Sequence, residues 1–183
     1  GAGRGGTLMA RTALTPTGAR LGKGPRAGAD YIPATTVFAG SLLSALPIIS
    51  STGWWPDFGL LMLLGWRLLR ADAWPAWWAA PLGFANDLIV GNPIGLSIAL
   101  WTAMMIAMDI LDRRTMWRDY WIEWAMAALL IGLSEAAQWR VAGLLGAPVP
   151  FSRAVLPAII VGALCFPVAA YIASRIDRWR LGR

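Results

Sequence analysis

From residue 31 onward the chain alternates between long apolar runs and short clusters of charged residues. Each run has roughly 15 to 25 residues, and about 20 residues of α-helix cross the ~30 Å hydrocarbon core of a bilayer. The pattern therefore predicts an all-α polytopic membrane protein with six transmembrane helices. The expected segments are residues 32–52, 57–70, 75–91, 93–110, 119–143 and 153–175, of which the second is short.

The first 30 residues differ from the rest of the chain. They are rich in Gly, Ala, Arg and Thr and carry few bulky apolar side chains. Such a segment buries too little apolar surface to offset the entropy lost on ordering. We therefore expect a disordered, basic cytoplasmic tail at residues 1–30 and one six-helix transmembrane domain at residues 31–183.

Composition narrows the class of function. The chain is 57% hydrophobic and only 14% charged, which excludes an ordinary soluble enzyme. Six spans leave roughly 33 residues of the domain for all loops, too few for a catalytic domain outside the membrane. With no His and one Cys, histidine bases, zinc or haem sites and internal disulfides lack their ligands or partners. We expect neither an enzyme nor a cofactor or metal site.

The basic residues predict the orientation of the spans. Only Arg140 and Arg153 fall on one side of the expected membrane. The other side holds Arg4, Arg11, Arg20, Lys23, Arg26, Arg67, Arg70, Arg113, Arg114, Arg118, Arg175, Arg178, Arg180 and Arg183. The positive-inside rule then places both termini in the cytoplasm. Topology also accounts for the net charge of +6, so we expect no nucleic-acid partner.

The tryptophans fit the same map. All but Trp101 lie at or near the end of an expected span, Trp66 and Trp124 at inner ends among them. Because the indole ring prefers the level of the lipid headgroups, we interpret them as aromatic belts.

The most informative stretch runs from Gly83 to Ser97, between the third and fourth spans. Gly83, Asp87, Gly91 and Gly95 are spaced four apart, so on a helix the first three share one stripe where glycine allows close backbone approach. Gly91 or Asn92 suits a left-handed cap and Pro93 the first turn of the next helix. We predict a tight helical hairpin on the outer side.

Polar residues within the spans are the candidate functional residues. Asp87 falls in the outer half of its span, where a lipid-facing carboxylate is costly. It is expected to be buried, either as a structural group bonded to the hairpin backbone or facing a polar cavity, or as a contact to a partner or ligand. Asn86, Glu135 and Gln138 are the other candidate residues of such a cavity. An interhelical hydrogen bond or an Arg140 partner is the structural alternative for Glu135 and Gln138.

Two further acidic residues, Asp109 and Asp112, lie at the inner end of the fourth span, beside Arg113 and Arg114. We interpret them as an interfacial charge cluster. An intramembrane phosphotransferase would need more clustered Asp residues with metal-binding spacing than these two provide.

The sequence resembles a known family. Six spans in under 200 residues, the Pro56-Asp57-Phe58 start of a span that carries Trp66, and the G-x-x-x-D-x-x-x-G-x-x-x-G-L segment from Gly83 to Leu96 resemble the rod shape-determining protein MreD family. The resemblance covers roughly residues 32–176, and the tail departs from the family's compact pattern.

The resemblance implies a non-catalytic scaffold of the bacterial cell-elongation machinery, which makes peptidoglycan and sets rod shape. Its expected location is the inner membrane, and its implied partners are MreC, the MreB filament, RodA and a penicillin-binding transpeptidase. The family's fold is similar to the substrate-binding membrane subunits of vitamin transporters. The alternative function is therefore a solute-binding transporter subunit, with Asp87, Asn86, Glu135 and Gln138 around an outward pocket.

Overall fold

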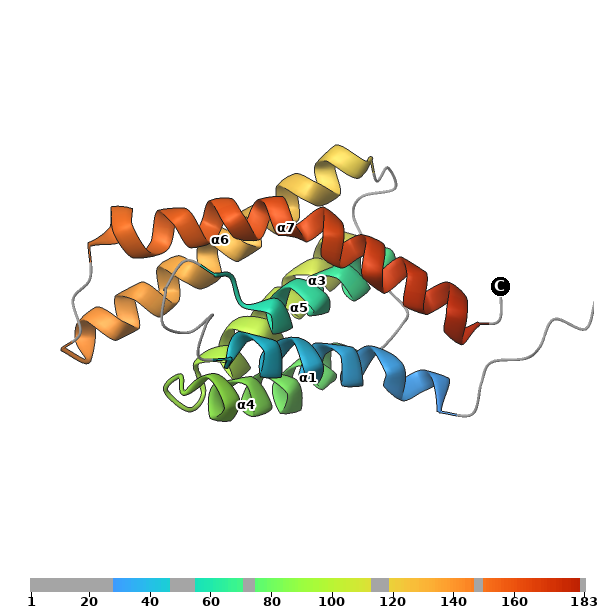
Figure 1. Cartoon of the computed structure of the whole chain (residues 1–183), viewed down its shortest axis with the longest axis horizontal. Helices are drawn as coiled ribbons and strands as arrows, with labels where there is room; N and C mark the ends of the chain where they lie inside the picture. The colour runs from blue at the N-terminus through green and yellow to red at the C-terminus, as the bar shows by residue number, and fades with distance from the viewer. Residues whose placement is uncertain (1–27, 47–54, 71–74, 113–118, 147–149, 182–183) are drawn as a thin grey trace, which may run out of the picture.

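The computed structural model describes residues 28–46, 55–70, 75–112, 119–146 and 150–181. All regular structure in these ranges is helical (Figure 1). The six α-helices are α1 (Ile32–Ser44), α3 (Phe58–Leu69), α4 (Ala79–Val90), α5 (Leu96–Asp112), α6 (Tyr120–Leu144) and α7 (Phe151–Arg180). Two 3₁₀ turns, η1 (Ala29–Tyr31) and η3 (Ala76–Trp78), precede α1 and α4.

The prediction of an all-α chain with six helices is confirmed within the described residues. The helices coincide with the six apolar segments, although their ends differ. α4 starts at Ala79 because η3 takes the first residues of its segment, and α7 extends to Arg180. Residues 1–27 of the expected tail lie outside the described residues, whereas residues 29 and 30 belong to η1.

One helix of the described chain, α7, is both long and apolar enough to cross a membrane by itself. α3 is apolar but has only 12 residues. At 1.5 Å per residue it extends about 18 Å, well short of a bilayer core.

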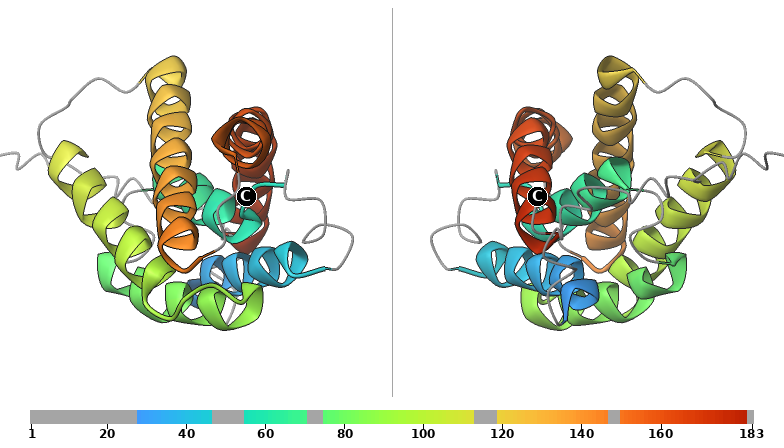
Figure 2. Two further views of the ribbon diagram at one scale, coloured as in Figure 1. Left: turned by 90° about the vertical axis from the view of Figure 1, so that its left-hand side faces the viewer. Right: turned by 90° about the vertical axis from the view of Figure 1, so that its right-hand side faces the viewer.

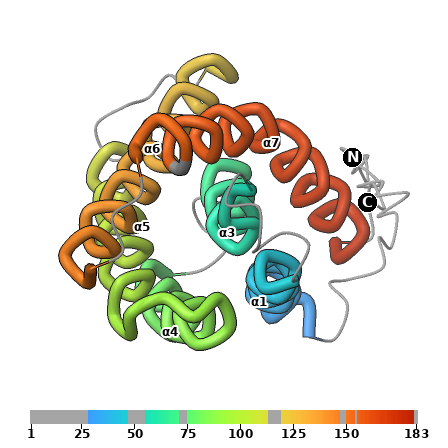
Figure 3. The backbone as a smooth tube through the Cα atoms, turned by 60° about the vertical axis from the view of Figure 1, so that its left-hand side comes forward, coloured from blue at the N-terminus to red at the C-terminus, as the bar shows by residue number. Residues whose placement is uncertain are grey.

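α3 is the central helix of the molecule. Figure 3 shows it encircled by the other helices, with α7 curving past it. Nine of its twelve residues are buried. α1, α6 and α7 pack against it directly, while α4 packs on both α1 and α5; Figure 2 shows this enclosure from both ends. The buried core accordingly includes Leu60, Leu63 and Leu64 of α3, Trp101 of α5 and Ile131 of α6.

Glycines allow two of these contacts to be close. A Cβ at Gly40 of α1 would lie 2.7 Å from the carbonyl oxygen of Phe58, and a Cβ at Gly83 of α4 would lie 2.8 Å from the Cα of Ile98. Both neighbours are backbone, which moves less easily than a side chain. The backbone approach that we predicted at Gly83 is therefore present.

The expectation was wrong for the other half of the glycine stripe. A Cβ at Gly91 would meet nothing within 4 Å, so this residue does not mediate helix contact. Gly91 ends α4 with φ of 81°, which confirms the left-handed cap that was expected at Gly91 or Asn92. Pro93 lies in the connection, before α5 begins at Leu96, rather than in the first turn of that helix.

The curved helix α7 contains two prolines, Pro157 and Pro167. Proline has no N–H, so the carbonyl four residues before it loses its helical partner. At Ala163, four residues before Pro167, the indole Nε1 of Trp124 donates to this oxygen at 2.9 Å. Trp124 therefore fastens α6 to α7, a role that its interpretation as a belt residue missed.

Candidate functional site

The polar candidates meet where α3 and α5 begin and α4 ends. We call this group, formed by Asp57, Asn86, Asp87 and Ser97, the cap end. Asn86, Asp87 and Ser97 are at most 1% exposed. Because α3 and α5 both start here, their unpaired N–H groups point into the cluster. The cluster is therefore rich in backbone donors and provides side-chain acceptors for them.

Asp87 caps a helix that is not its own. One carboxylate oxygen accepts from the backbone N–H of Gly95 at 2.8 Å and the other from that of Ser97 at 2.9 Å. These N–H groups belong to the start of α5, where a negative charge is also favoured by the helix dipole. Asp87 thus has one of the arrangements expected from the sequence, a bond to the hairpin backbone. Capping by Asp87 also explains why α5 starts after Pro93.

Asn86 links the remaining members of the cap end. Its Nδ2 donates to Asp57 Oδ2 at 2.8 Å and to Ser97 Oγ at 3.1 Å. Asp57 in turn caps α3 by accepting from Leu60 N at 3.2 Å. The Oγ of Ser44 in α1 accepts from Phe58 N at 2.9 Å. Side chains therefore join the ends of four helices, α1, α3, α4 and α5, into one network.

The cap end has unused hydrogen-bonding capacity and no cation. The Oδ1 atom of Asn86 is buried without a partner. Within the described residues no basic side chain pairs with Asp57 or Asp87, although the two acids interact electrostatically. The cap end therefore contains one buried acceptor, Asn86 Oδ1, that is not used within the described chain.

Glu135 and Gln138 do not join the network by hydrogen bonds. Gln138 donates to Ser134 on the preceding turn of its own helix at 3.2 Å, rather than across to another helix. Glu135 is half-buried and faces the charge of Asp57, but among the described residues its carboxylate has no hydrogen-bond or ion-pair partner. Arg140, its suggested partner, lies instead over the ring of Trp139 at 5.9 Å.

The opposite end of the helix group, which we call the arginine end, contains Arg67, Arg70 and Arg180. Arg67 of α3 pairs with Asp109 and Asp112 of α5, the latter at 2.8 Å. The Arg67 side chain is only 2% exposed, against 41% for Asp109. The two acids were expected to cluster with Arg113 and Arg114, which lie outside the described residues. Arg67 was counted only as a topology signal, and its pairing role was missed.

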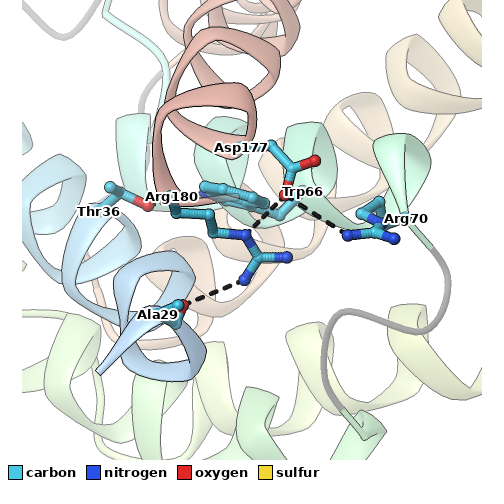
Figure 4. Close-up of polar contacts among 6 residues, drawn as sticks. All are labelled: Ala29, Thr36, Trp66, Arg70, Asp177 and Arg180. Carbon is cyan, nitrogen blue, oxygen red and sulfur yellow. Dashed lines mark hydrogen bonds and ion pairs between the residues drawn. The ribbon is translucent and has the colours of Figure 1, made fainter. Parts of the chain in front are cut away.

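Figure 4 shows the second cluster of the arginine end. Arg180 Nε donates to Asp177 at 2.6 Å, and its Nη1 donates to the carbonyl of Ala29 at 3.1 Å. The guanidinium also lies 5.2 Å from the ring centre of Trp66, close enough for a cation–π contact. Arg70 reaches the same carboxylate at 3.8 Å. The last turn of α7 is thereby fastened to the start of the described chain and to α3.

Trp66 is not a belt residue. It is fully buried, and its Nε1 donates to Thr36 Oγ1 at 2.7 Å. A tryptophan near the inner end of a span has the same sequence signature whether it faces headgroups or protein. The three-residue spacing of Asp177 and Arg180 was the one local signal of this cluster.

Among the described residues, no group of three or more His, Cys, Asp or Glu is placed to hold a metal ion. A comparison with known protein families, curated proteins and solved structures gives no match to this chain.

Proposed function

We propose that this chain is a non-catalytic six-helix subunit of the bacterial inner membrane with both termini in the cytoplasm. The observation that carries the proposal is a contrast in polarity: the outward faces of the helices expose apolar side chains, whereas the polar and charged groups gather at the two ends. Large apolar side chains point outward along the helices; five of them, Ile106, Leu129, Leu133, Leu164 and Val168, are 49–65% exposed. Water would strongly disfavour this surface, whereas lipid or a partner helix would cover it without cost.

Two of the six helices, α6 and α7, are long enough to cross a bilayer core, whereas α1, α3 and α4 have 13, 12 and 12 residues. α6 has 25 residues, about 37 Å, and α7 has 30. The short helix α3 is surrounded by protein and does not need to match the bilayer. The helices run alternately between the cap end and the arginine end, which agrees with an arginine end at the cytoplasmic face.

The contacts that the polar groups make support a scaffold role. Asp87, Asn86 and Arg67 hold helices together. In a membrane, where no hydrophobic effect drives helices together, such bonds and close glycine contacts fix a rigid body. Such a body suits the positioning of partner helices. By its resemblance to the MreD family, we propose that it serves the cell-elongation machinery, with MreC, the MreB filament, RodA and a penicillin-binding transpeptidase as partners.

A solute-binding transporter subunit is the second candidate. The unpartnered Oδ1 of Asn86 and the unpaired carboxylate of Glu135 favour it, since both would accept from a small polar solute near the cap end. An energising ATPase would then be the partner that co-purifies with the chain.

Co-purification with the MreC encoded in the same genome tests the scaffold proposal. Ile94 in the α4–α5 connection is 72% exposed, and Leu144 at the end of α6 is 87% exposed. Both lie toward the cap end, so Leu144→Asp is a matched control for Ile94→Asp. We expect both variants to fractionate with membranes, and Ile94→Asp alone to reduce capture of MreC at least tenfold.

Three outcomes contradict parts of the proposal. If the wild-type chain sits in the membrane but captures no MreC, its assignment to the elongation machinery is wrong. If Ile94→Asp and Leu144→Asp capture MreC equally, the hairpin is not the contact. If a reporter of cytoplasmic exposure is active at residue 147 and inactive at residue 183, the orientation is wrong.

A further inference from the structure

An apolar groove runs between α1, α3 and α7. Its volume is about 430 Å³, within the usual range for sites that hold a small ligand. Ala39 and Gly40 form one wall, Phe58 and Leu61 the floor, and Cys165 and Ile172 the other wall. None of the described residues that line this groove is charged. Its chemistry therefore suits a hydrocarbon chain.

The groove leads to a basic pocket. Ile176 lines both the groove and a second cavity of about 350 Å³, whose other lining residues are Arg175, Arg178 and Trp179. On α7 the residues at 165, 168, 172, 175 and 179 follow a helical spacing of three or four, so they share one stripe. One face of a single helix thus changes from apolar to basic at the arginine end.

The two arginines of this pocket are available to an external anion. Arg175 and Arg178 are exposed, and within the described part of the chain neither pairs with a carboxylate. The nearby acid Asp177 is engaged by Arg180 at 2.6 Å and by Arg70 at 3.8 Å. Internal pairing of Asp177 therefore leaves the pocket with a net positive charge. Guanidinium groups bind phosphate oxygens in a fixed, forked geometry.

We propose that the groove and the basic pocket together hold one anionic phospholipid of the cytoplasmic leaflet. An acyl chain lies in the groove between α1, α3 and α7, and the phosphate lies between Arg175 and Arg178. Trp179 is then at the level of the headgroup, where indole rings are favoured. Basic pockets at the cytoplasmic ends of membrane helices bind such headgroups, and two cations disfavour a headgroup that carries its own ammonium.

This inference rests on the membrane insertion proposed above but not on the scaffold role. It gives the arginine end a second use, because the lipid would bridge α7 and α1, which Arg180 also connects through Ala29. A bound lipid would also fill a cavity that otherwise loses packing contacts in the folded protein. We therefore expect phospholipid to stabilise the full chain in detergent.

Native mass spectrometry of the full chain in mild detergent tests the proposal, with phosphatidylglycerol and phosphatidylcholine offered in equal amounts. We expect one phosphatidylglycerol to be retained in preference to phosphatidylcholine. Arg175→Gln with Arg178→Gln should weaken this retention roughly 30-fold, the effect of two surface cations. Arg140→Gln with Arg153→Gln removes the same charge at the other end and should leave retention unchanged.

A second variant tests the groove separately. Ala39 is exposed, so Ala39→Phe fills the groove without disturbing the core and should lower retention of phosphatidylglycerol. Equal retention of both lipids, or unchanged retention in the Arg175/Arg178 variant, overturns the proposal. Displacement of the lipid by millimolar inorganic phosphate, or full retention by Ala39→Phe, would replace it with a headgroup-only anion site. A chain that never reaches the membrane fraction would instead refute the insertion on which both proposals rest.

Discussion

At the cap end the helices are joined through backbone N–H groups, whereas at the arginine end they are joined through ion pairs. Asp87 accepts two N–H bonds from the start of α5, the helix that follows its own. Arg67 instead pairs with Asp109, which lies 42 residues away along the chain. The first kind of junction depends on the shape of a local turn, and the second on two distant segments arriving at the same place.

The two junctions therefore fail in different ways. Loss of an acceptor at the cap end leaves neutral N–H groups without a partner, each worth a modest penalty. Loss of the acids at the arginine end leaves a charge in a buried position, which is far more costly. The predictions below test this difference by equilibrium unfolding in mixed micelles of mild detergent and SDS, followed by tryptophan fluorescence.

The largest effect is expected for the double substitution Asp109→Asn with Asp112→Asn. It leaves the 2% exposed guanidinium of Arg67 without its counter-charges and should lower the free energy of unfolding by about 3–5 kcal/mol. Adding Arg67→Met to the double variant should restore most of this loss. Arg70→Gln is the control. The Arg70 side chain is 43% exposed and lies 3.8 Å from Asp177, so its loss should lower the free energy of unfolding by less than about 1 kcal/mol. A double variant as stable as this control would show that Arg67 is solvated in some other way.

A steric change at the cap end should rank second. In Gly83→Ala the new methyl group would lie 2.8 Å from the backbone of Ile98, so α4 and α5 must separate. We expect a loss of about 1–3 kcal/mol, toward the upper end because backbone cannot rotate away. Gly91→Ala meets no neighbour and should cost only the left-handed strain, about 1–2 kcal/mol. If Gly91→Ala is the more damaging variant, the cap and not the close approach fixes the hairpin.

The smallest of the three effects is expected for Asp87→Asn. Both carboxylate oxygens of Asp87 accept an N–H bond, so asparagine keeps one bond and turns an NH₂ donor toward the other N–H. A loss of about 1–2 kcal/mol follows from one unsatisfied donor. Asp87→Leu removes both bonds and should cost more in the same measurement. Wild-type stability of both variants, with MreC capture lost, would assign Asp87 to a partner contact instead.

The sequence predicts a feature of this structure best when the residues that form it are close together along the chain. The six helices and the burial of Asp87 follow from hydropathy and from the cost of a charge among apolar neighbours. The bond between Asp57 and Asn86 was missed because it joins segments 29 residues apart. The capping role of Asp57 was also missed, although it is local: Asp57 accepts from Leu60 N three residues later, and an Asp directly before an apolar helix is a typical N-cap signal. Arg67 was counted with the topology signals because a buried arginine and a headgroup-facing arginine look alike in sequence. Trp66 was misplaced for the same reason.

The separation between Arg67 and its acids also bears on how the protein is made. Ribosomes add about 5–20 residues per second, so roughly 2–8 s pass between the synthesis of Arg67 and that of Asp109. During that interval α3 has been made, but the acidic residues that neutralise the charge of Arg67 have not. In the orientation proposed above, Arg67 lies at the cytoplasmic end of α3 and gains its acidic partners only after α5 has been made. We therefore expect α3 to reach its final depth in the bilayer together with α5 rather than alone.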